Sequence, residues 1–419
     1  MNKTKRFFAV IFTLIMTFSS FAICANADEN TKELKFKDGK FKILVLADVQ
    51  DTDKPQQETV DLMTNAIDKT QPDLIVLTGD NIAGWWRNVT PEKTEKAVEN
   101  VAKTINDRKI PFALVFGNHD HEGLSDEVNQ MEEAEAKELV LSWFKEYEYC
   151  LATEGEAMTG LANYNLTVKD SVGEKDIFNM WFMDSNTYSD ESEGGGYGYV
   201  HKDQIEWYES KSNELKEANG GKPLPSLVFQ HIAVPETYEM FNEVPKGTKG
   251  AIRGNAGHTK QYYVENPDYV LQGELNEGPC SANTANDGQF DSWVKQGDVI
   301  GAVFGHDHIN TYTGELEGIK LMATPGVTFH AYGNNRGVRT ITLNESNLND
   351  FETEVLLFSD LVDYEVKNIF IREFGYETYR RKIIPAIIGI SVGLVVIAAA
   401  VTVTVKVVKK KKSEKINKP

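Results

Sequence analysis

Polar side chains able to bind a metal ion follow short apolar runs at five places in the sequence. They are carboxylate, amide and imidazole groups: Asp48, Asp80, Asn118, His231, and His306 with His308. Such nitrogen and oxygen ligands suit divalent ions of the Mn, Fe or Zn type, and not soft thiolate chemistry. Two such ions held close together can clamp a phosphate group and activate water near neutral pH. These residue types therefore predict a metal-dependent site, if the fold gathers the five places.

The elements expected in the first half of the chain would gather them. Apolar runs predict strands at residues 41–47, 73–78 and 112–116, and helical spacing predicts helices at residues 57–69 and 91–107. This alternation implies parallel strands joined by right-handed crossovers. The carboxyl ends of such strands face one crevice, where ligands bind. We therefore expect an α/β (α+β) protein with its site at that edge.

The second half is predicted to add further strands and helices. Helices are expected at residues 125–145, 201–216 and 289–296, and strands at 164–168, 178–183, 226–230, 299–304, 319–323, 338–343 and 353–358. Residues 235–287 form a long polar segment rich in Gly and Asn. We expect this segment to be an active-site loop or lid and not a second domain.

In their order along the chain, the polar blocks resemble the motifs of the calcineurin-like metallophosphoesterases. The blocks are Asp48-Val49-Gln50, Gly79-Asp80-Asn81, Gly117-Asn118-His119-Asp120, His231, and Gly305-His306-Asp307-His308. The resemblance runs from about residue 41 to residue 343. With Met183-Asp184-Ser185 and residues 204–208, the chain is similar to the branch related to purple acid phosphatases, which includes plant members described as inactive. The resemblance implies a β-sandwich flanked by helices, in four α/β/β/α layers, with a dinuclear metal centre.

The resemblance also implies roles for these residues. One metal ion would be held by Asp48, Asp80 and His308, with Gln50 as a further candidate ligand. The second would be held by Asp80, Asn118, His231 and His306, so that Asp80 bridges the two ions. His119 would protonate the leaving group, and Asp120 would orient the imidazole of His119. The implied reaction is the hydrolysis of a phosphate monoester or diester by a metal-activated hydroxide.

Two positions depart from the family pattern. Gln50 stands where many members have a metal-binding His, and an amide oxygen is a poorer donor than imidazole for zinc or iron. Ile82-Ala83 follows Asp80-Asn81 with no tyrosine, so the coloured ferric centre of purple acid phosphatases is not expected. Gln50 keeps open the alternative of a non-catalytic, metal-stabilised surface binding module of the same fold. A specific phosphodiesterase or nucleotidase is a further alternative.

The two ends of the chain predict export and membrane anchoring. Residues 1–27 combine a basic start, an apolar run and a small-residue cleavage site, as in a secretory signal peptide; an uncleaved anchor is the alternative. Residues 383–405 carry no charge, and at ~1.5 Å per residue a helix of this length crosses the ~30 Å hydrocarbon core of a bilayer. The predicted organisation is signal peptide 1–27, metallophosphoesterase domain 28–365, juxtamembrane segment 366–382, transmembrane helix 383–405 and basic cytoplasmic tail 406–419. The domain would then face the outside of the cell.

The net charge limits the classes of partner that the domain can bind, and the cysteine content limits the disulfides that it can form. The chain has a formal net charge of −19 although both of its ends are basic. The predicted domain therefore repels nucleic-acid backbones, and nucleic acid is not expected as a partner. The expected partners are a phosphate-ester substrate and, through the C-terminal helix, the membrane. Cys150 and Cys280 would remain after export and could form a disulfide or stay free and buried.

Some residues outside the blocks leave two interpretations open. Trp85-Trp86-Arg87 could wall a substrate site or simply pack its loop. His330 and Tyr332 could reach the pocket, or a local hydrogen bond could hold His330. We expect surface or loop positions for His121, His201 and His258, and a flexible turn at Gly194-Gly195-Gly196.

Overall fold

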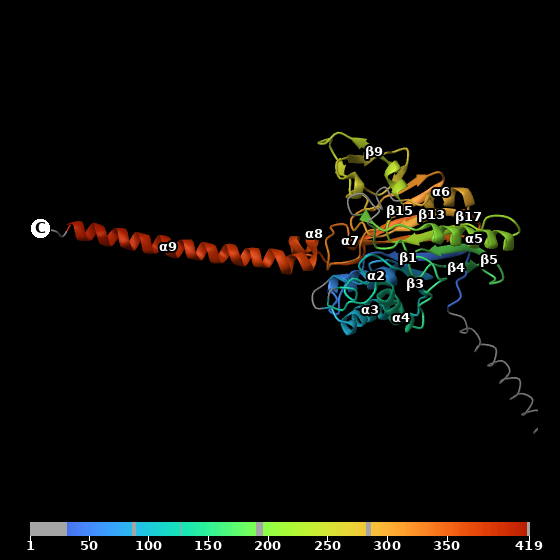
Figure 1. The fold of residues 1–419 in the computed structure, drawn as a ribbon, viewed down its shortest axis with the longest axis horizontal. Helices are drawn as coiled ribbons and strands as arrows, with labels where there is room; N and C mark the ends of the chain where they lie inside the picture. The colour runs from blue at the N-terminus through green and yellow to red at the C-terminus, as the bar shows by residue number, and fades with distance from the viewer. Residues whose placement is uncertain (1–31, 86–88, 127, 190–195, 282–285, 417–419) are drawn as a thin grey trace, which may run out of the picture.

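The computed structural model describes residues 32–416 except 86–88, 127, 190–195 and 282–285. In this part of the chain two β-sheets pack face to face, helices cover both outer faces, and one long helix projects from the domain (Figure 1). The arrangement agrees with the four layers that the family resemblance implies. The predicted signal peptide at residues 1–27 lies outside the described residues.

The first sheet combines three N-terminal strands with two C-terminal ones. Its order is β17-β16-β1-β2-β3, in which β1, β2 and β3 are parallel and β16 is antiparallel to both neighbours. The strands are β1 (Lys40–Leu46), β2 (Leu74–Thr78), β3 (Phe112–Val115), β16 (Gly337–Asn344) and β17 (Asn347–Leu357). β17 starts earlier than its predicted bounds of 353–358 because it pairs with β16 in one continuous hairpin.

Three helices cover the outer face of this sheet: α2 (Gln57–Thr70), α3 (Pro91–Asn106) and α4 (Glu133–Lys145). The hydroxyl of Thr90 caps α3 by accepting a hydrogen bond from the backbone N–H of Lys93. The predicted helix at 125–145 is wrong in its first part. There the carboxylate of Asp126 accepts hydrogen bonds from the backbone N–H groups of residues 128 and 129, and a turn replaces the helix.

The second sheet has the order β12-β14-β15-β13-β8-β5-β4, and β5, β8, β13 and β15 run parallel within it. Its strands are β4 (Tyr164–Lys169), β5 (Asp176–Phe182), β8 (Ser226–Gln230), β12 (Val270–Gln272), β13 (Val299–Phe304), β14 (Thr313–Leu316) and β15 (Ile319–Ala323). Helices α5 (Lys202–Ala218) and α6 (Gln289–Gln296) pack against this sheet. Strands β8, β13 and β15 and helix α6 have the predicted bounds.

Alternation along the strands explains why the second sheet is covered on both faces. In β8, Leu227 and Phe229 belong to the core shared with the first sheet, whereas Val228 belongs to a second core with α5 and α6. In β13, Val303 faces the first core and Ala302 faces the second. Successive side chains of a strand point to opposite faces, so a wholly apolar run requires two buried faces.

The segment 235–287 has more structure than the predicted loop or lid. It carries the 3₁₀ helices η1 (Pro235–Met240) and η2 (Ala256–His258), and a three-stranded sheet of order β10-β11-β9. The strands are β9 (Phe241–Val244), β10 (Ile252–Arg253) and β11 (Tyr262–Glu265). A further hairpin pairs β6 (Tyr188–Ser189) with β7 (Gly196–Tyr197). Of the three glycines predicted to form a flexible turn, Gly194 and Gly195 lie outside the described residues and Gly196 begins β7.

The C-terminal elements run from the domain into the long helix. They are α7 (Phe358–Leu361), α8 (Ile369–Thr378), the π-helical turn η3 (Tyr379–Ile383) and α9 (Ile384–Ile416). Among the described residues, one helix is long and apolar enough to cross a membrane, and its most apolar window has a mean hydropathy of 2.7 with no part buried. The predicted span at 383–405 lies in this helix.

Cys150 and Cys280 are free thiols in the structure. Cys280 is buried, and Cys150 is half-buried beside β3. This resolves the disulfide alternative left open by the sequence. Burial raises the pKa of Cys150 to about 11, so little reactive thiolate forms near neutral pH.

Candidate metal centre

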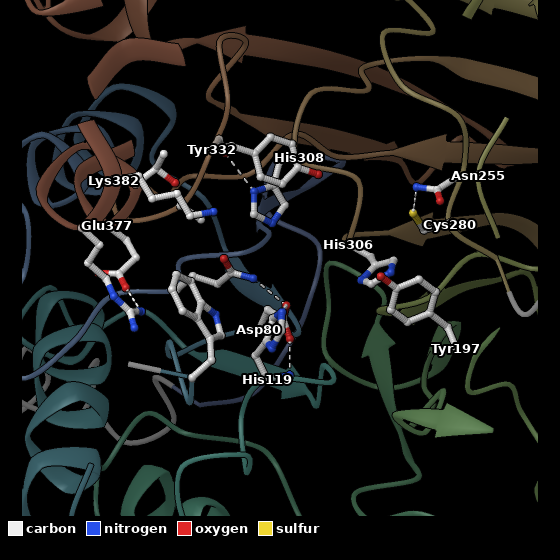
Figure 2. Close-up of a pocket in the computed structure, with 15 residues that line it drawn as sticks. Asp80, His119, Tyr197, Asn255, Cys280, His306, His308, Tyr332, Glu377 and Lys382 are labelled. Atoms are coloured by element: carbon white, nitrogen blue, oxygen red, sulfur yellow. Dashed lines mark hydrogen bonds and ion pairs between the residues drawn. The ribbon is translucent and has the colours of Figure 1, made fainter. Parts of the chain in front are cut away.

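The candidate ligands meet at the carboxyl ends of strands from both sheets. Asp48, Asp80 and Asn118 follow β1, β2 and β3, while His231 follows β8 and both His306 and His308 follow β13. Figure 2 shows Asp80, His119, His306 and His308 around one pocket. The structure thus brings together the five loops that the sequence singled out.

Four of these residues have an unusual backbone conformation. Asp48, Gln50, Asp80 and His306 have φ angles of 49°, 35°, 49° and 71°. Residues other than glycine rarely adopt this left-handed region, and such strain gathers at functional sites, where the surrounding structure enforces it. In each case the strand ends and the chain turns sharply, which directs the side chain into the crevice and not along the sheet.

Two glycines let these turns approach one another. A Cβ on Gly117 would lie 2.2 Å from both the backbone N and Oδ1 of Asp80. A Cβ on Gly79, where φ is 87°, would lie 2.6 Å from Nδ1 of His231. Glycine is therefore required at both positions by close packing against candidate ligands.

Asp80, His231 and His306 form the most compact group of candidate ligands. One ligand atom from each lies within 4.8 Å of the other two. His231 Nδ1 contacts the carbonyl of Thr78 at 2.9 Å, which leaves its Nε2 facing Asp80 Oδ2 at 3.4 Å and His306 Nδ1 at 3.2 Å. A carbonyl that fixes the far ring nitrogen is the arrangement that orients histidine ligands in metal sites.

Asp48 and His308 form a second, adjoining pair. His308 Nδ1 contacts the carbonyl of Tyr332 at 2.9 Å, and its Nε2 faces Asp48 Oδ1 at 3.4 Å. The other carboxylate oxygen of Asp48 accepts a hydrogen bond of 2.9 Å from the backbone N–H of His306, which joins the two groups. Gln50 contacts the first group and donates from Nε2 to Asp80 Oδ2 at 2.6 Å.

The electrostatics of the site favour positive charge. Burial alone would lower the pKa of His231, but the carboxylate of Asp80 outweighs this and raises the pKa to about 10. Likewise, burial lowers the pKa of His308, and Asp48 and Glu277 more than reverse the effect and raise it to about 9. Burial opposes ionisation of Asp80, yet His231 and His119 hold its pKa well below the usual range. A buried site with this much carboxylate character is suited to cations.

Four buried acceptor atoms in the site have no hydrogen-bond partner within the described part of the chain. They are Asp48 Oδ1, Gln50 Oε1, Asn118 Oδ1 and His306 Nε2. Leaving a buried polar atom unpaired costs about 1–3 kcal/mol, so such atoms in one place call for an explanation. A set of carboxylate, amide and imidazole acceptors without donors fits divalent metal ions of the Mn, Fe or Zn type. The residues present therefore fit the implied cofactor.

The contacts of His119 correct one prediction. Its Nδ1 contacts Oε2 of Glu122 at 2.5 Å, and its Nε2 lies 3.9 Å from Asp80 Oδ2. Asp120, which the sequence assigned to orient the imidazole, instead accepts hydrogen bonds from the backbone N–H groups of Asn81, Ile82 and Gly117. The Asp120 carboxylate therefore joins the loop that carries Asp80 to the loop that carries Asn118 through these hydrogen bonds. Burial, with the charge of Asp80, raises the pKa of Asp120 to about 7.

Sequence reasoning missed several groups around the ligands. Glu122 is three residues after His119, a spacing that could have suggested it. Tyr188 Oη contacts Asn118 Nδ2 at 3.1 Å and donates to Glu122 Oε1 at 2.8 Å. The ring of Tyr197 lies 4.2 Å from that of His306. Both tyrosines come from the short β6–β7 hairpin, for which the sequence carries no comparable signal.

The structure also decides the positions left open outside the blocks. Trp85 lines the pocket, with its ring centroid 5.0 Å from that of His330, while Trp86 and Arg87 lie outside the described residues. Tyr332 lines the pocket and stacks on His308 at 4.4 Å. His330 is buried, and neither of its ring nitrogens has a hydrogen-bond partner among the described residues, so no local hydrogen bond holds it. His121 lies in a turn between β3 and α4, in agreement with the surface or loop prediction, but its side chain is buried, with Nε2 3.7 Å from Oε2 of Glu133.

A cavity of about 400 Å³ lies over these groups. Its walls include Asp80, His119, His306 and His308 on the strand-end side, and Trp85, Tyr197 and Tyr332 beside them. The juxtamembrane residues Glu377, Thr378, Arg381 and Lys382 complete it. Figure 2 shows Glu377 and Lys382 approaching from one side and Tyr197 from the other.

A protein-family model agrees with this geometry. The model described as calcineurin-like phosphoesterase matches residues 41–310, which include every candidate ligand. Among solved structures, the chain is similar to a dimetal phosphatase from Danio rerio, with 14% identity, a TM-score of 0.42, and coverage of 75% of this chain and 98% of that one.

Two curated relatives show the breadth of the similarity. The chain is 29% identical over 341 residues to "Probable inactive purple acid phosphatase 29" of Arabidopsis thaliana, covering 73% of this chain and 77% of the relative. It is 25% identical over 314 residues to "Phosphatase DCR2" of Saccharomyces cerevisiae, covering 71% of this chain and 48% of that protein. The relatives thus include proteins named as inactive and one named as a phosphatase.

Proposed function

The chain belongs to the calcineurin-like phosphoesterase family, and from this premise we propose that it is a membrane-anchored, extracytoplasmic hydrolase of phosphate monoesters or diesters that works with two divalent metal ions. One observation carries the proposal: four buried acceptors without donors, from Asp48, Gln50, Asn118 and His306, occur in the strand-end loops that bring ligand atoms of Asp80, His231 and His306 within 4.8 Å of one another. A site of this kind is costly for the fold unless cations complete it.

Six residues would hold the metals, with Gln50 as a seventh candidate. Asp48, Asp80 and His308 would bind one ion, and Asp80, Asn118, His231 and His306 the other. A bound metal pair supplies charge neutralisation for the phosphate and a lowered pKa for the attacking water. The carbonyls of Thr78 and Tyr332 keep His231 and His308 in the orientation that presents Nε2 to the carboxylates.

His119 is proposed as the general acid. It lines the cavity beside Asp80, and its contact with Glu122 places a proton on Nδ1 and leaves Nε2 to carry the transferable proton. Burial alone lowers the pKa of His119, but Asp80 and Glu122 raise it above the ordinary value. A protonated imidazole is therefore available near neutral pH to donate to the leaving oxygen, a contribution of typically about 10²–10⁴-fold to the rate.

Membrane anchoring rests on α9. Its side chains along the apolar stretch are exposed, so nothing in the described chain buries them. Lysines follow the apolar stretch at 406 and 409–412, and such a cluster stays on the cytoplasmic side. The proposed organisation keeps the boundaries at 28–365 for the domain, 366–382 for the juxtamembrane segment, 383–405 for the span and 406–419 for the tail, with residues 1–27 as a cleaved signal.

Metal analysis combined with a panel of phosphate esters tests this function. We expect Asp80→Ala and His231→Ala to lose bound metal and turnover together while the circular dichroism of the fold is kept. His119→Asn should keep its metal and lose about 10²-fold or more in kcat. His258→Ala, in the 3₁₀ helix η2 and outside the set of candidate ligands, serves as the histidine control. Wild-type metal content in Asp80→Ala or His231→Ala would contradict the ligand assignment.

A non-catalytic binding module of the same fold is the second candidate. Two observations favour it: the neutral amide of Gln50 is hydrogen-bonded to Asp80, and some relatives are named as inactive. A module does not need a general acid, whereas His119 and its partner Glu122 are both in place. If the metal-loaded protein turns over no ester and His119→Asn changes nothing measurable, the module is the better description.

A further inference from the structure

The juxtamembrane segment forms part of the wall of the candidate active site. Glu377, Thr378, Arg381 and Lys382 line the same cavity as Asp80 and the histidines. Figure 2 shows Lys382 and Glu377 entering the view from the helices at one side, with Tyr332 and His308 next to them. The chain that leads into the membrane-spanning helix therefore also shapes the entrance to the site.

The juxtamembrane helix is tied closely to the domain. The backbone N–H groups of Tyr376 and Glu377 donate to the carbonyls of Phe329 and His330 at 2.9 and 3.0 Å. At Gly375 α8 kinks with a φ of 74°, and a Cβ there would lie 2.0 Å from the carbonyl oxygen of Ala331. These backbone contacts fix α8 against the loop at residues 328–332.

The same loop carries the contact that orients a candidate ligand. The carbonyl of Tyr332 contacts His308 Nδ1 at 2.9 Å, and the Tyr332 ring stacks on the His308 ring. Tyr376 Oη donates to Glu58 at 2.8 Å and anchors the helix from its other side. The position of α8 relative to the metal centre is thus fixed by the loop 328–332 and by α2.

This geometry places the pocket mouth at the level of lipid headgroups. Lys382 lines the pocket, and the charge-free stretch begins at the next residue, Ile383. Since one helical turn is about 5.4 Å, the mouth lies within about a turn of the start of the hydrocarbon span.

The charges at the mouth suit an anionic headgroup. Arg381 is paired with Glu377, but no carboxylate pairs with Lys382 in the part of the chain that the structure describes. Cations next to a bilayer attract anionic lipid headgroups. The chain as a whole is strongly acidic, which disfavours the approach of soluble phosphate esters from the side of the domain.

We propose, building on the phosphoesterase function above, that the substrate is a phosphate ester carried on a lipid of the same membrane leaflet, which enters the pocket from the bilayer surface past Lys382. The metal centre would act on the headgroup while the acyl chains stay in the membrane. The alternative source of the same chemistry is a free, water-soluble phosphate ester.

The first test compares one ester bond in two settings. The full-length protein is reconstituted in phosphatidylcholine vesicles with Mn²⁺, and phosphate release is measured from phosphatidic acid in those vesicles and from dissolved glycerol 3-phosphate. Confinement of enzyme and substrate to one surface raises the effective concentration, so we expect kcat/KM to favour the lipid by about 10²-fold or more. Equal values for the two forms would overturn the inference.

The second test uses a variant in which only the height of the pocket above the membrane is changed. A flexible Gly-Ser segment of about twelve residues, with a root-mean-square length of roughly 20 Å, is inserted between Lys382 and Ile383. We expect turnover of the lipid to fall about 10-fold and turnover of glycerol 3-phosphate to stay unchanged. The same insertion between Val408 and Lys409, beyond the span, is the matched control and should change neither rate. Unchanged lipid turnover in the first insertion overturns the inference.

Binding of phosphatidic acid in the absence of turnover provides an independent test of the proposal. In metal-free protein, acetylation of Lys382 is followed by mass spectrometry in vesicles with and without phosphatidic acid. We expect phosphatidic acid to protect Lys382 about 5-fold or more, since one cation next to an anionic headgroup is worth roughly that factor. The exposed Lys222 of the domain, after α5, is the control and should not be protected. Lack of protection at Lys382 counts against the proposal.

The results separate the two proposals. Turnover of the soluble ester without any preference for the lipid overturns the lipid substrate and leaves the phosphoesterase function standing. Absence of turnover on both forms, with metal bound, contradicts the phosphoesterase function itself.

Discussion

Single residues of the metal centre combine strain, burial and missing hydrogen bonds. Asp48, Gln50, Asp80 and His306 hold left-handed backbone conformations, and three of the four also have a buried acceptor without a donor. Strain of this kind costs of order 1–3 kcal/mol per residue and persists where the surroundings impose it. Bound cations would offset part of that cost, so we expect the metal to stabilise the domain as well as to activate it.

Gln50 provides a sharp test at this scale. Its amide contacts Asp80 and has donor strength below that of an imidazole, so the ion held by Asp48, Asp80 and His308 should be the weaker of the two. We expect Gln50→His to lower the metal concentration for half-maximal activity by about 10-fold, the scale of changes around a metal.

Metal titration with equilibrium dialysis checks this, and Gln50→Ala serves as the comparison. If the amide oxygen is a ligand, Gln50→Ala should weaken the same site further. Identical metal dependence in wild type, Gln50→His and Gln50→Ala would show that Gln50 takes no part.

His330 is predicted to make the domain sensitive to acid. Burial, opposed by Glu377 and reinforced by Arg380 and Arg381, lowers its pKa to about 4. The neutral imidazole therefore contributes stability that is fully present above about pH 6.5 and is lost as the pH falls through 4.

His330→Phe should remove that dependence. Relative to wild type, the variant should gain at most about 3 kcal/mol in unfolding free energy between about pH 8 and about pH 4, measured by urea unfolding of the detergent-solubilised chain. The same difference between the two proteins at both pH values would mean that His330 titrates normally.

At the scale of elements, the strand ends carry the candidate ligands and α8 forms part of the pocket wall. Strands β1, β2 and β3 in one sheet and β8 and β13 in the other all end at the same edge of the sandwich. Helix α8 reaches that edge from the far end of the sequence and binds the loop 328–332 through backbone hydrogen bonds. An element outside the predicted domain boundary at 365 is therefore part of the pocket.

Gly375→Ala should release α8 from the domain. The new Cβ would meet the Ala331 carbonyl at 2.0 Å in a backbone conformation that alanine disfavours, so the contact cannot be kept without movement. We expect faster hydrogen exchange of residues 328–333 and 369–378, with the sheet core unchanged.

Gly393→Ala is the matched control, because a Cβ at Gly393 in α9 meets nothing within 4 Å. It should leave the exchange of residues 328–333 at the wild-type rate. Unchanged exchange in Gly375→Ala itself would contradict the close docking of α8.

At the scale of the whole molecule, a compact domain is held at the end of one long helix (Figure 1). The acidic domain and the basic residues at both ends of the apolar span give the molecule a strong charge asymmetry along its length. In the membrane-anchored organisation proposed above, such an asymmetry would orient the domain against the membrane surface, with the cations of η3 nearest to the headgroups.

Truncation after Lys382 tests the anchor. Since the apolar side chains of α9 are exposed and lie beyond this point, the shortened protein should move from the membrane fraction to the soluble fraction. Turnover of a soluble ester should be kept within about 3-fold, because all pocket-lining residues remain. Fractionation and assay of the two fractions measure both outcomes; a truncated protein that stays with the membrane has another anchor.

The sequence by itself determined most of the strands and helices around the site and the set of candidate ligands. Apolar runs such as 226–230, 299–304 and 319–323 mark strands buried on both faces. The polar residues that follow such runs can be identified in the sequence directly. Because parallel strands end at one edge, the order of these runs was enough to expect Asp48, Asp80, Asn118 and His231 in one crevice. This information is local, so it can be read without the fold.

The tertiary structure decided what depends on contacts between distant segments. His119 contacts Glu122 and not Asp120, because the Asp120 carboxylate accepts hydrogen bonds from backbone amides instead. Tyr188 and Tyr197 enter the site from a hairpin with no motif, and α8 reaches the pocket only through its docking on the loop 328–332. Side-chain partners across the chain are set by packing geometry, which residue types and spacing along one sequence do not encode.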